Sequence, residues 1–296
     1  MDKRISDFNT KKVNAEKKFY MAFGIIGVAV LVFIILSSQY LVNLMFIPII
    51  IGVVGLIFLG IAAADFEKLK KKFKNDFLKE MFSELIPGIT YNPKMGLSES
   101  QVYQSEFLKK ADRFHTEDYL EGKIDDIDFI SSDVCLEERR VRHTKNGTQV
   151  YYVPYFVGRV FQFDFHKELV GSLQVLETGS PVSRRKYKKV QLESIDFNKK
   201  FRIYSEEELT AFYILTPDIM EAIFALEKRY PGNISFSFLN EKLHLGIHNN
   251  KNTFELRLFR KLSLDEIEAF KADLLVIKDV IHTLKLNNSI FKKREE

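Results

Sequence analysis

Residues 20–64 read YMAFGIIGVAVLVFIILSSQYLVNLMFIPIIIGVVGLIFLGIAAA, without a single Asp, Glu, Lys, Arg or His. Two apolar runs, 20–36 and 44–64, are each near the ~20 residues that a helix needs to cross a ~30 Å hydrocarbon core. Residues 37–43 join them as a short uncharged linker. A cleaved signal peptide has a shorter apolar region and no second span, and a buried soluble hairpin is the other alternative. We predict a transmembrane helical hairpin over 20–64.

Cations flank this hairpin on both sides, whereas its linker has none. They are Lys3, Arg4, Lys11, Lys12, Lys17 and Lys18 before it, and Lys68, Lys70, Lys71, Lys72, Lys74 and Lys79 after it. Positive flanks stay on the cytoplasmic side, so we expect a multi-pass protein of the inner or plasma membrane with both termini cytoplasmic. The expected organisation is a basic tail (1–19), the hairpin, juxtamembrane helices and linker (65–110), and a cytosolic domain (111–296).

The charge of the remaining chain is nearly balanced. Of 44 cations and 40 anions, the tail holds six and three, which leaves 38 and 37. A balance this even gives no reason to expect nucleic-acid binding. The single cysteine, Cys135, excludes an internal disulfide and fits a reducing compartment.

Residues 65–85 carry apolar side chains at helical spacing, namely Phe66, Leu69, Phe73, Phe77, Met81 and Leu85. One interpretation of this helix is a basic surface, with Lys68, Lys71 and Lys72 on anionic lipid. The other is a juxtamembrane helix whose aromatic stripe packs on the domain while its lysines only set the topology.

Strand and helix patterns beyond residue 88 occur in clusters and not in βαβ alternation, which predicts an α+β fold with mainly antiparallel sheet and flanking helices. Asn146-Gly147 is the preferred dipeptide for a two-residue hairpin turn. Expected helices cover 98–110, 205–215, 216–230 and 263–286, and expected strands include 156–165, 234–239, 242–248 and 254–258.

A basic loop follows at residues 178–189. Arg184, Arg185, Lys186, Lys188 and Lys189 surround Tyr187. Cations interleaved with an aromatic residue can bind phosphate or stack on a base. The alternative is an ordinary solvated loop; if this one binds anions, the nearby membrane makes lipid headgroups the expected ligand.

Motifs for catalysis are absent: there is no P-loop, GxGxxG after a strand, GxSxG or HExxH. Cys135 lies among apolar neighbours, which indicates core packing. His244 and His248 alternate with apolar residues on a strand, where residues four apart are ~13 Å apart and do not share a metal ion. Asp126 and Asp128 are predicted to share a strand face where a divalent cation could bind, the alternative being a solvated face. We expect no enzyme and no cofactor.

Several segments resemble a bacterial family of unknown function, DUF3137, whose members have a two-span hairpin and a cytosolic domain. The matching residues are 89–93 (ITYNP), 117–122 (EDYLEG), 156–161 (FVGRVF), 197–204 (FNKKFRIY), 214–222 (ILTPDIMEA), 234–238 (ISFSF) and 252–255 (NTFE). Val157 departs from the family pattern, which commonly has Lys there. The resemblance implies fold and topology but no reaction, and it suggests a LemA-like membrane protein as partner.

Three functions remain open. The first is a membrane-anchored interaction or scaffold module that binds a membrane protein or a copy of itself through a surface that includes Tyr155 and Phe156. The second is an anionic-lipid-binding or lipid-sensing protein that uses the basic helix and the basic loop. The third is an enzyme with an unrecognised metal site at Asp126 and Asp128.

Overall fold

The computed structural model of the protein describes residues 2–145, 147–164 and 171–286. These residues form two compact units. The first unit contains the chain up to Lys79 together with Glu255–Ala269, and the second contains Glu80–Phe254 and the chain from Phe270 onward. The chain therefore leaves the first unit, builds most of the second, returns to the first and leaves it again.

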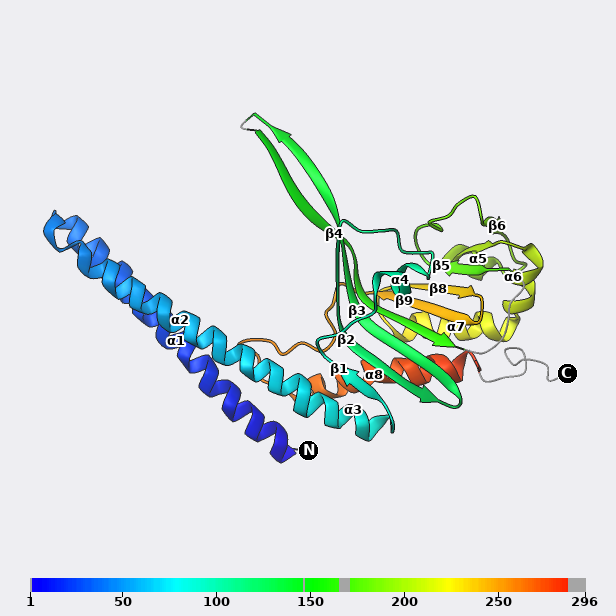
Figure 1. The fold of residues 1–296 in the computed structure, drawn as a ribbon, viewed down its shortest axis with the longest axis horizontal. Coiled ribbons are helices and arrows are strands. Elements are labelled where there is room, and N and C mark those ends of the chain that lie inside the picture. The colour runs from blue at the N-terminus through cyan, green and yellow to red at the C-terminus, as the bar shows by residue number, and fades with distance from the viewer. Residues whose placement is uncertain (1, 146, 165–170, 287–296) are drawn as a thin grey trace. The chain divides into compact units, whose positions relative to one another are not determined.

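The first unit is a hairpin of two long helices, α1 (Asp2–Ser38) and α2 (Phe46–Lys72), joined through the 3-10 turn η1 (Val42–Leu44) (Figure 1). Both helices are long and apolar enough to cross a membrane, as predicted. Large apolar side chains such as Leu31 and Leu56 are 60% and 62% exposed, as expected for lipid-facing positions. The two helices pack closely at Gly55, where a Cβ atom would lie 2.6 Å from the side chain of Ile26.

The basic tail belongs to this hairpin, because α1 already begins at Asp2. Residues 255–262, which we call the strap, follow the sheet in sequence and contact the basic tail near the start of α1. The Asn9 side chain donates to the Leu262 carbonyl (2.8 Å) and accepts from its N–H (3.0 Å). Lys12 is only 1% exposed and donates to the Arg260 carbonyl at 2.7 Å. Lys12 therefore has a structural role within the first unit.

The amphipathic helix predicted over 65–85 is confirmed, with one irregularity. From α2 the helix continues through the π-helical turn η2 (Phe73–Leu78) into α3 (Lys79–Leu85). Its aromatic stripe packs on protein: Phe73 stacks on Phe77 with ring centroids 5.5 Å apart, and Phe8 of α1 lies 5.3 Å from Phe73. Its packing partner is thus α1 of the same unit.

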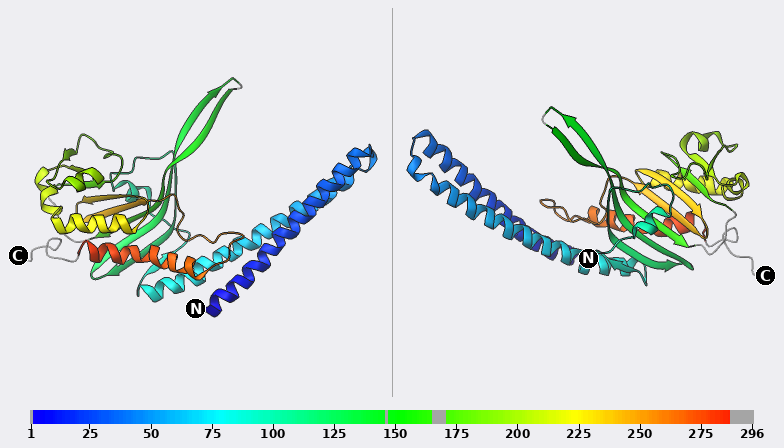
Figure 2. Two further views of the ribbon diagram at one scale, coloured as in Figure 1. Left: turned by 180° about the vertical axis from the view of Figure 1, so that it is seen from behind. Right: turned by 45° about the horizontal axis from the view of Figure 1, so that its top comes forward.

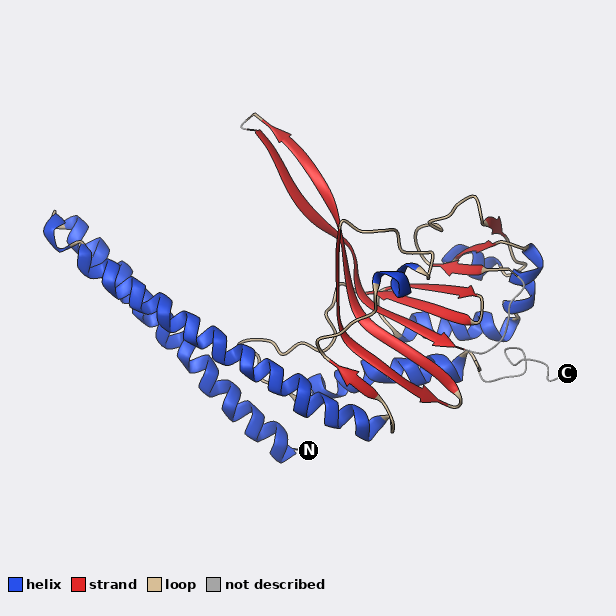
Figure 3. Ribbon diagram, viewed as in Figure 1, coloured by secondary structure: helices blue, strands red, loops and turns tan. Residues whose placement is uncertain are grey.

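The second unit is built on a nine-stranded sheet in which all pairs are antiparallel, in the order β1-β2-β3-β4-β9-β8-β5-β7-β6 (Figure 3). The strands are β1 (Thr90–Asn92), β2 (Arg113–Ile124), β3 (Ile127–Thr144), β4 (Gly147–Asp164), β5 (Leu173–Leu176), β6 (Lys188–Val190), β7 (Arg202–Ser205), β8 (Asn233–Leu239) and β9 (Lys242–His248). The predicted α+β class with antiparallel sheet is therefore correct.

Helices cover both faces of this sheet. They are α4 (Glu99–Tyr103), α5 (Ile195–Lys200), α6 (Glu208–Ile214), α7 (Pro217–Arg229) and α8 (Leu264–Thr283), of which α8 enters the second unit at Phe270. One face is aromatic, with Phe161, Phe163, Phe236 and Phe238 buried, and α7 and α8 lie side by side across it (Figure 2). The opposite face carries a cluster beside α4, formed by Leu97, Val102, Leu108, Val134, Leu136, Phe156 and Val160.

Three local expectations differ from the structure. The helix that Ser98 caps ends at Tyr103 and not near residue 110, because the chain turns at Glu106 with φ 56°. Residues 254–258, expected as a strand, have no strand structure and lead into the strap. Residues 195–200, where no helix was expected, form α5, which Ser194 caps. The predicted turn residue Asn146 and the strand end at Phe165 lie outside the described residues.

Gly158 of β4 lies where β9 approaches most closely, since a Cβ there would meet the Ile247 carbonyl oxygen at 1.9 Å. Backbone does not yield as a side-chain tip does, so we expect Gly158→Ala to lower the free energy of unfolding by about 1–3 kcal/mol. Unfolding in mild detergent, followed by circular dichroism, measures this. The control Gln149→Ala, at an exposed position of the same strand, should change stability by less than about 0.5 kcal/mol. Equal stability of the two variants would contradict the close approach.

Candidate binding surfaces of the sheet unit

A two-stranded arm extends from the sheet where β3 and β4 continue beyond their neighbours (Figure 1). We define the arm as residues 139–153. In this range β3 and β4 pair only with each other: β2 joins β3 no further than Glu137, and β9 joins β4 only from Gly158. Both outer edges of the arm thus have backbone groups free of any strand partner in the described part of the chain. The Asn-Gly signal predicted this hairpin but not its projection.

The arm is exposed, cationic and partly apolar. It contains Arg139, Arg140, Arg142 and Lys145 and no carboxylate. Its aliphatic and aromatic side chains are half-exposed, with Val141 42%, Val150 47%, Tyr151 47% and Val153 39% exposed. Arg140 pairs with Glu138 at the base of the arm at 2.6 Å. The arm therefore presents positive charge next to uncovered apolar surface.

A hollow of about 390 Å³ lies at the base of the arm. Its wall contains Tyr155, Phe156 and Arg184, so the structure brings the predicted interaction residues and one end of the predicted basic loop to one place. Phe156 is only 5% exposed and belongs to the buried cluster beside α4, which corrects its prediction as a surface residue. Tyr155 is half-buried, and its hydroxyl donates to the Lys109 carbonyl. Burial also raises the pKa of the Tyr155 hydroxyl.

The cations of the basic loop divide into two groups. Lys186 forms an ion pair with Glu106 at 3.1 Å, and the Tyr187 hydroxyl donates to the same carboxylate at 2.5 Å. The other four, Arg184, Arg185, Lys188 and Lys189, are exposed and have no ion pair within the described residues. The loop is thus fastened at its centre and leaves most of its charge uncompensated.

A second and larger hollow, of about 790 Å³, is also lined by residues of this loop. Its lining residues are Gly179, Ser180, Pro181, Arg184, Tyr187, Lys189, Arg202 and Tyr204. We call it the cationic hollow, because Arg184, Lys189 and Arg202 line it and no carboxylate does. Sequence reasoning missed Arg202 and Tyr204, since a single Arg and a single Tyr on a short strand form no pattern.

A row of polar side chains crosses the sheet toward this hollow. Cross-strand pairing puts one residue from each of six strands on one line: Gln162, His244, Ser237, Gln174, Tyr204 and Lys189. The first four are at most 5% exposed. Within the described part of the chain, Gln162 Oε1, His244 Nδ1, Ser237 Oγ and both amide atoms of Gln174 have no hydrogen-bond partner. Burial lowers the pKa of His244 to about 4, so its ring is neutral at pH 7.

The remaining predicted site residues do not line these hollows. Lys68, Lys71 and Lys72 are exposed on α2 in the first unit. Asp126 is not on a strand face with Asp128, which corrects that prediction: it lies in the turn between β2 and β3, with φ 66°. Asp128 lies 3.8 Å from the Lys123 ammonium. A shared cation site of Asp126 and Asp128 on one strand face is therefore not supported.

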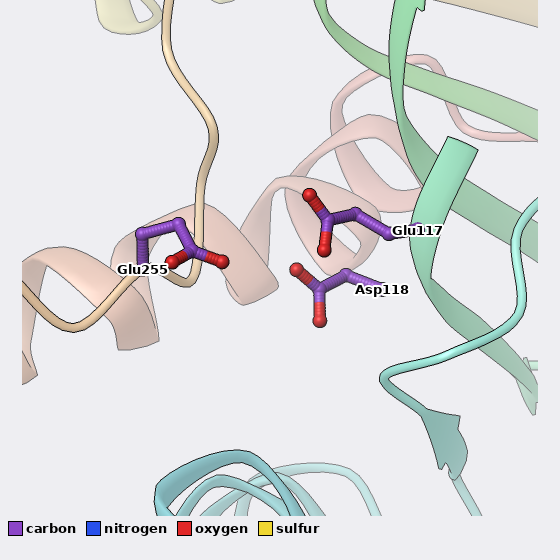
Figure 4. A group of neighbouring side chains, drawn as sticks. All are labelled: Glu117, Asp118 and Glu255. Atoms are coloured by element: carbon purple, nitrogen blue, oxygen red, sulfur yellow. The ribbon is translucent and has the colours of Figure 1, made fainter. Parts of the chain in front are cut away.

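A β-bulge in β2 places two carboxylates on the same side of the strand. The register with β3 breaks between Glu117 and Leu120, and Asp118 has φ 57°. As a result the side chains of Glu117 and Asp118, which are adjacent in sequence, point the same way (Figure 4). Glu255, also drawn there, belongs to the first unit, where it pairs with Lys74 at 2.6 Å.

The bulge carries part of a buried ion network that sequence reasoning missed. Arg159 is 4% exposed, and its guanidinium donates to Asp133 at 2.8 Å, to the Asp118 carbonyl at 2.7 Å and to Ser131 at 3.3 Å. Its Cζ atom lies over the ring of Phe254, 4.9 Å from the centroid. Arg159 is part of the family-like segment FVGRVF, which was the only sequence signal for it.

Other groups complete the network. The Asp133 carboxylate accepts from the Thr253 N–H (2.6 Å) and hydroxyl (2.9 Å). Burial raises the pKa of Asp133, against the attraction of Arg159. Burial likewise raises the pKa of Asp273 on α8 to about 6.

Cys135, in the neighbouring part of β3, is half-buried. Burial, and after it the charge of Glu137, raises the pKa of the Cys135 thiol. A raised pKa keeps the thiol protonated, which does not suit a nucleophile.

Removal of the Arg159 charge should leave Asp133 buried without its counter-ion. We expect Arg159→Gln to lower the free energy of unfolding by about 3–5 kcal/mol. Adding Asp133→Asn should recover part of that loss, because the uncompensated negative charge disappears with it. Unfolding of the two single variants and the double variant in mild detergent forms a double-mutant cycle. Strictly additive effects would show that the two charges are not coupled.

Asp273 should make stability depend on pH. Its pKa is raised from 3.8 to about 6, so between about pH 4 and pH 6 the folded protein binds more protons than the unfolded chain. Stability is therefore lost as the pH rises through this window. The advantage of Asp273→Asn over the parent should grow from pH 4 to pH 6 and then level off, by on the order of 1 kcal/mol per pKa unit. Asp196→Asn, on exposed α5, is the control and should show no such trend in urea unfolding.

No curated protein matches the chain in sequence. Among solved structures, the crystal structure of the mycobacterial trehalose monomycolate transport factor A, TtfA, shares 9% identity with it at a TM-score of 0.36. That match covers 70% of this chain and 97% of TtfA. A likeness of this weakness has no bearing on function.

The family comparison covers the second half of the chain. The match begins at Tyr155, so the family-like segments 89–93 and 117–122 lie outside it, whereas FVGRVF and the segments after it lie inside. It includes β5 to β9, the basic loop and the cationic hollow. Residues 155–286 match the family model of DUF3137, described as a protein of unknown function.

Proposed function

We propose that the protein is a membrane-anchored interaction module, whose cytosolic sheet unit binds an acidic segment of a second membrane protein through the arm. The anchor is the α1–α2 hairpin, with both termini on the cytosolic side. The cations that flank both helices, together with the uncharged linker, support this orientation. The module acts by binding.

The observation that carries the proposal is the exposed arm. A two-stranded hairpin without further strands is marginally stable in water, and its ordering costs conformational entropy. Here the hairpin has free edges and half-exposed apolar side chains, so little of its own burial offsets that cost. Contact with a partner would cover both the free strand edges and the half-exposed apolar side chains of the arm.

The charge of the arm indicates the chemistry of the partner. Four cations without a carboxylate favour an acidic surface and disfavour a basic one. The free strand edges suit an extended segment that adds as a further strand, with main-chain hydrogen bonds for affinity and charges for register. We therefore assign an extended acidic segment as the preferred partner.

Replacement of arm cations tests this assignment. Arg139→Ser with Arg142→Ser should abolish recovery of a stoichiometric partner when the tagged chain is purified from gently solubilised native membranes, because the complementary charge is gone. Mass spectrometry identifies the partner, and native mass measurement distinguishes a second protein from a second copy of the chain. Recovery from the parent should also fall as salt is raised.

The matched control removes two exposed cations from helices of the same unit, Lys228→Ser with Lys278→Ser. This variant should retain the partner at the parent level. A LemA-like protein in the complex would identify the partner suggested by the family resemblance. Recovery of the parent chain alone as a monomer, or a complex that survives the arm substitutions, would contradict the proposal.

A further inference from the structure

The cationic hollow gathers like charges without compensation. Arg184 and Lys189 have no ion pair among the described residues, and Arg202 donates only to the Gly179 carbonyl, at 2.9 Å. Glu106, the carboxylate that fastens the loop, is already bound by Lys186 and by the Tyr187 hydroxyl. Like charges around one hollow raise each other's energy unless an anion is present.

The chemistry of these side chains is that of a phosphate site. Guanidinium groups bind phosphate oxygens in pairs through a planar fork, and an ammonium adds a compact charge. Arg184 and Lys189 lie on the loop and on β6, whereas Arg202 lies on β7, so separate segments converge on one volume. The rings of Tyr187 and Tyr204 add flat surface to the wall.

The polar row ends at the cationic hollow. Tyr204 and Lys189 of the hollow are the last members of the row, and Gln174 is the cross-strand neighbour of Tyr204. Gln174 is fully buried and does not itself line the hollow, so the row supplies two polar side chains, those of Tyr204 and Lys189, to its wall.

We propose that the cationic hollow binds a phosphate-bearing ligand, either a lipid headgroup or a free phosphorylated small molecule. A volume of about 790 Å³ exceeds what inorganic phosphate fills and lies within the range of small-molecule sites. This site is separate from the arm, so its failure would leave the proposed protein interaction untouched.

The test measures protection of Lys189 in the full chain. The protein is reconstituted in nanodiscs, either of phosphatidylcholine alone or with phosphatidylglycerol added, and inorganic pyrophosphate is the soluble probe. The rate of lysine acetylation by a succinimidyl ester, read by mass spectrometry, is compared at Lys189 and at exposed Lys228. If pyrophosphate slows acetylation of Lys189 but not of Lys228 in nanodiscs of phosphatidylcholine alone, the result supports a free phosphorylated ligand. Slowing only with phosphatidylglycerol supports a headgroup.

Neighbouring arginines supply a matched pair of variants. Arg184 lines the hollow, whereas Arg185, equally exposed on the same loop, does not. We expect Arg184→Gln to lower the affinity for the protecting probe by about ten- to a hundredfold, because a charged hydrogen bond is lost. Arg185→Gln should lower that affinity by about twofold or less. Absence of protection by either probe, or equal effects of the two substitutions, would overturn the proposal.

Discussion

The positive charge of Arg159 has to be balanced inside the sheet unit, and one end of the sheet is arranged around that requirement. A guanidinium taken out of water loses several kcal/mol of hydration unless its donors find partners. Here the partners are Asp133 of β3 and the backbone of the β2 bulge at Asp118. Asp133 in turn holds Thr253, where the chain leaves the sheet. A single buried ion thus links β2, β3 and β4 to the exit toward the first unit.

The sequence predicts well those features that depend on residues close together in the chain. Hydropathy gives the α1–α2 hairpin, period-two alternation gives β8 and β9, and capping residues such as Ser98 and Thr216 mark helix starts. The ion network was missed because its members are separated by 26 residues between Arg159 and Asp133 and by 120 between Asp133 and Thr253. Local periodicity contains no information about such partners.

Prediction of the candidate surfaces was uneven for the same reason. Phe156 was expected on the interaction surface with Tyr155, but it packs against residues distant in sequence, such as Leu97 and Leu108, which no local pattern indicates. The cations of the basic loop were visible in sequence because they are consecutive. Arg202 joins them only through pairing of β6 with β7, which no local pattern indicates. The direction of the arm likewise depends on where its neighbouring strands stop.

The strap has a consequence for the timing of synthesis. The bond between Asn9 and Leu262 joins residues 253 positions apart, so α1 leaves the ribosome well before the strap to which Asn9 binds. At about 5–20 residues per second that interval is roughly 10–50 s. The hairpin is thus ready for the membrane long before the contacts that lock its N-terminal end exist. A chain that stops short of the strap would keep its anchor and leave Asn9 and the buried Lys12 without the carbonyl groups that bind them.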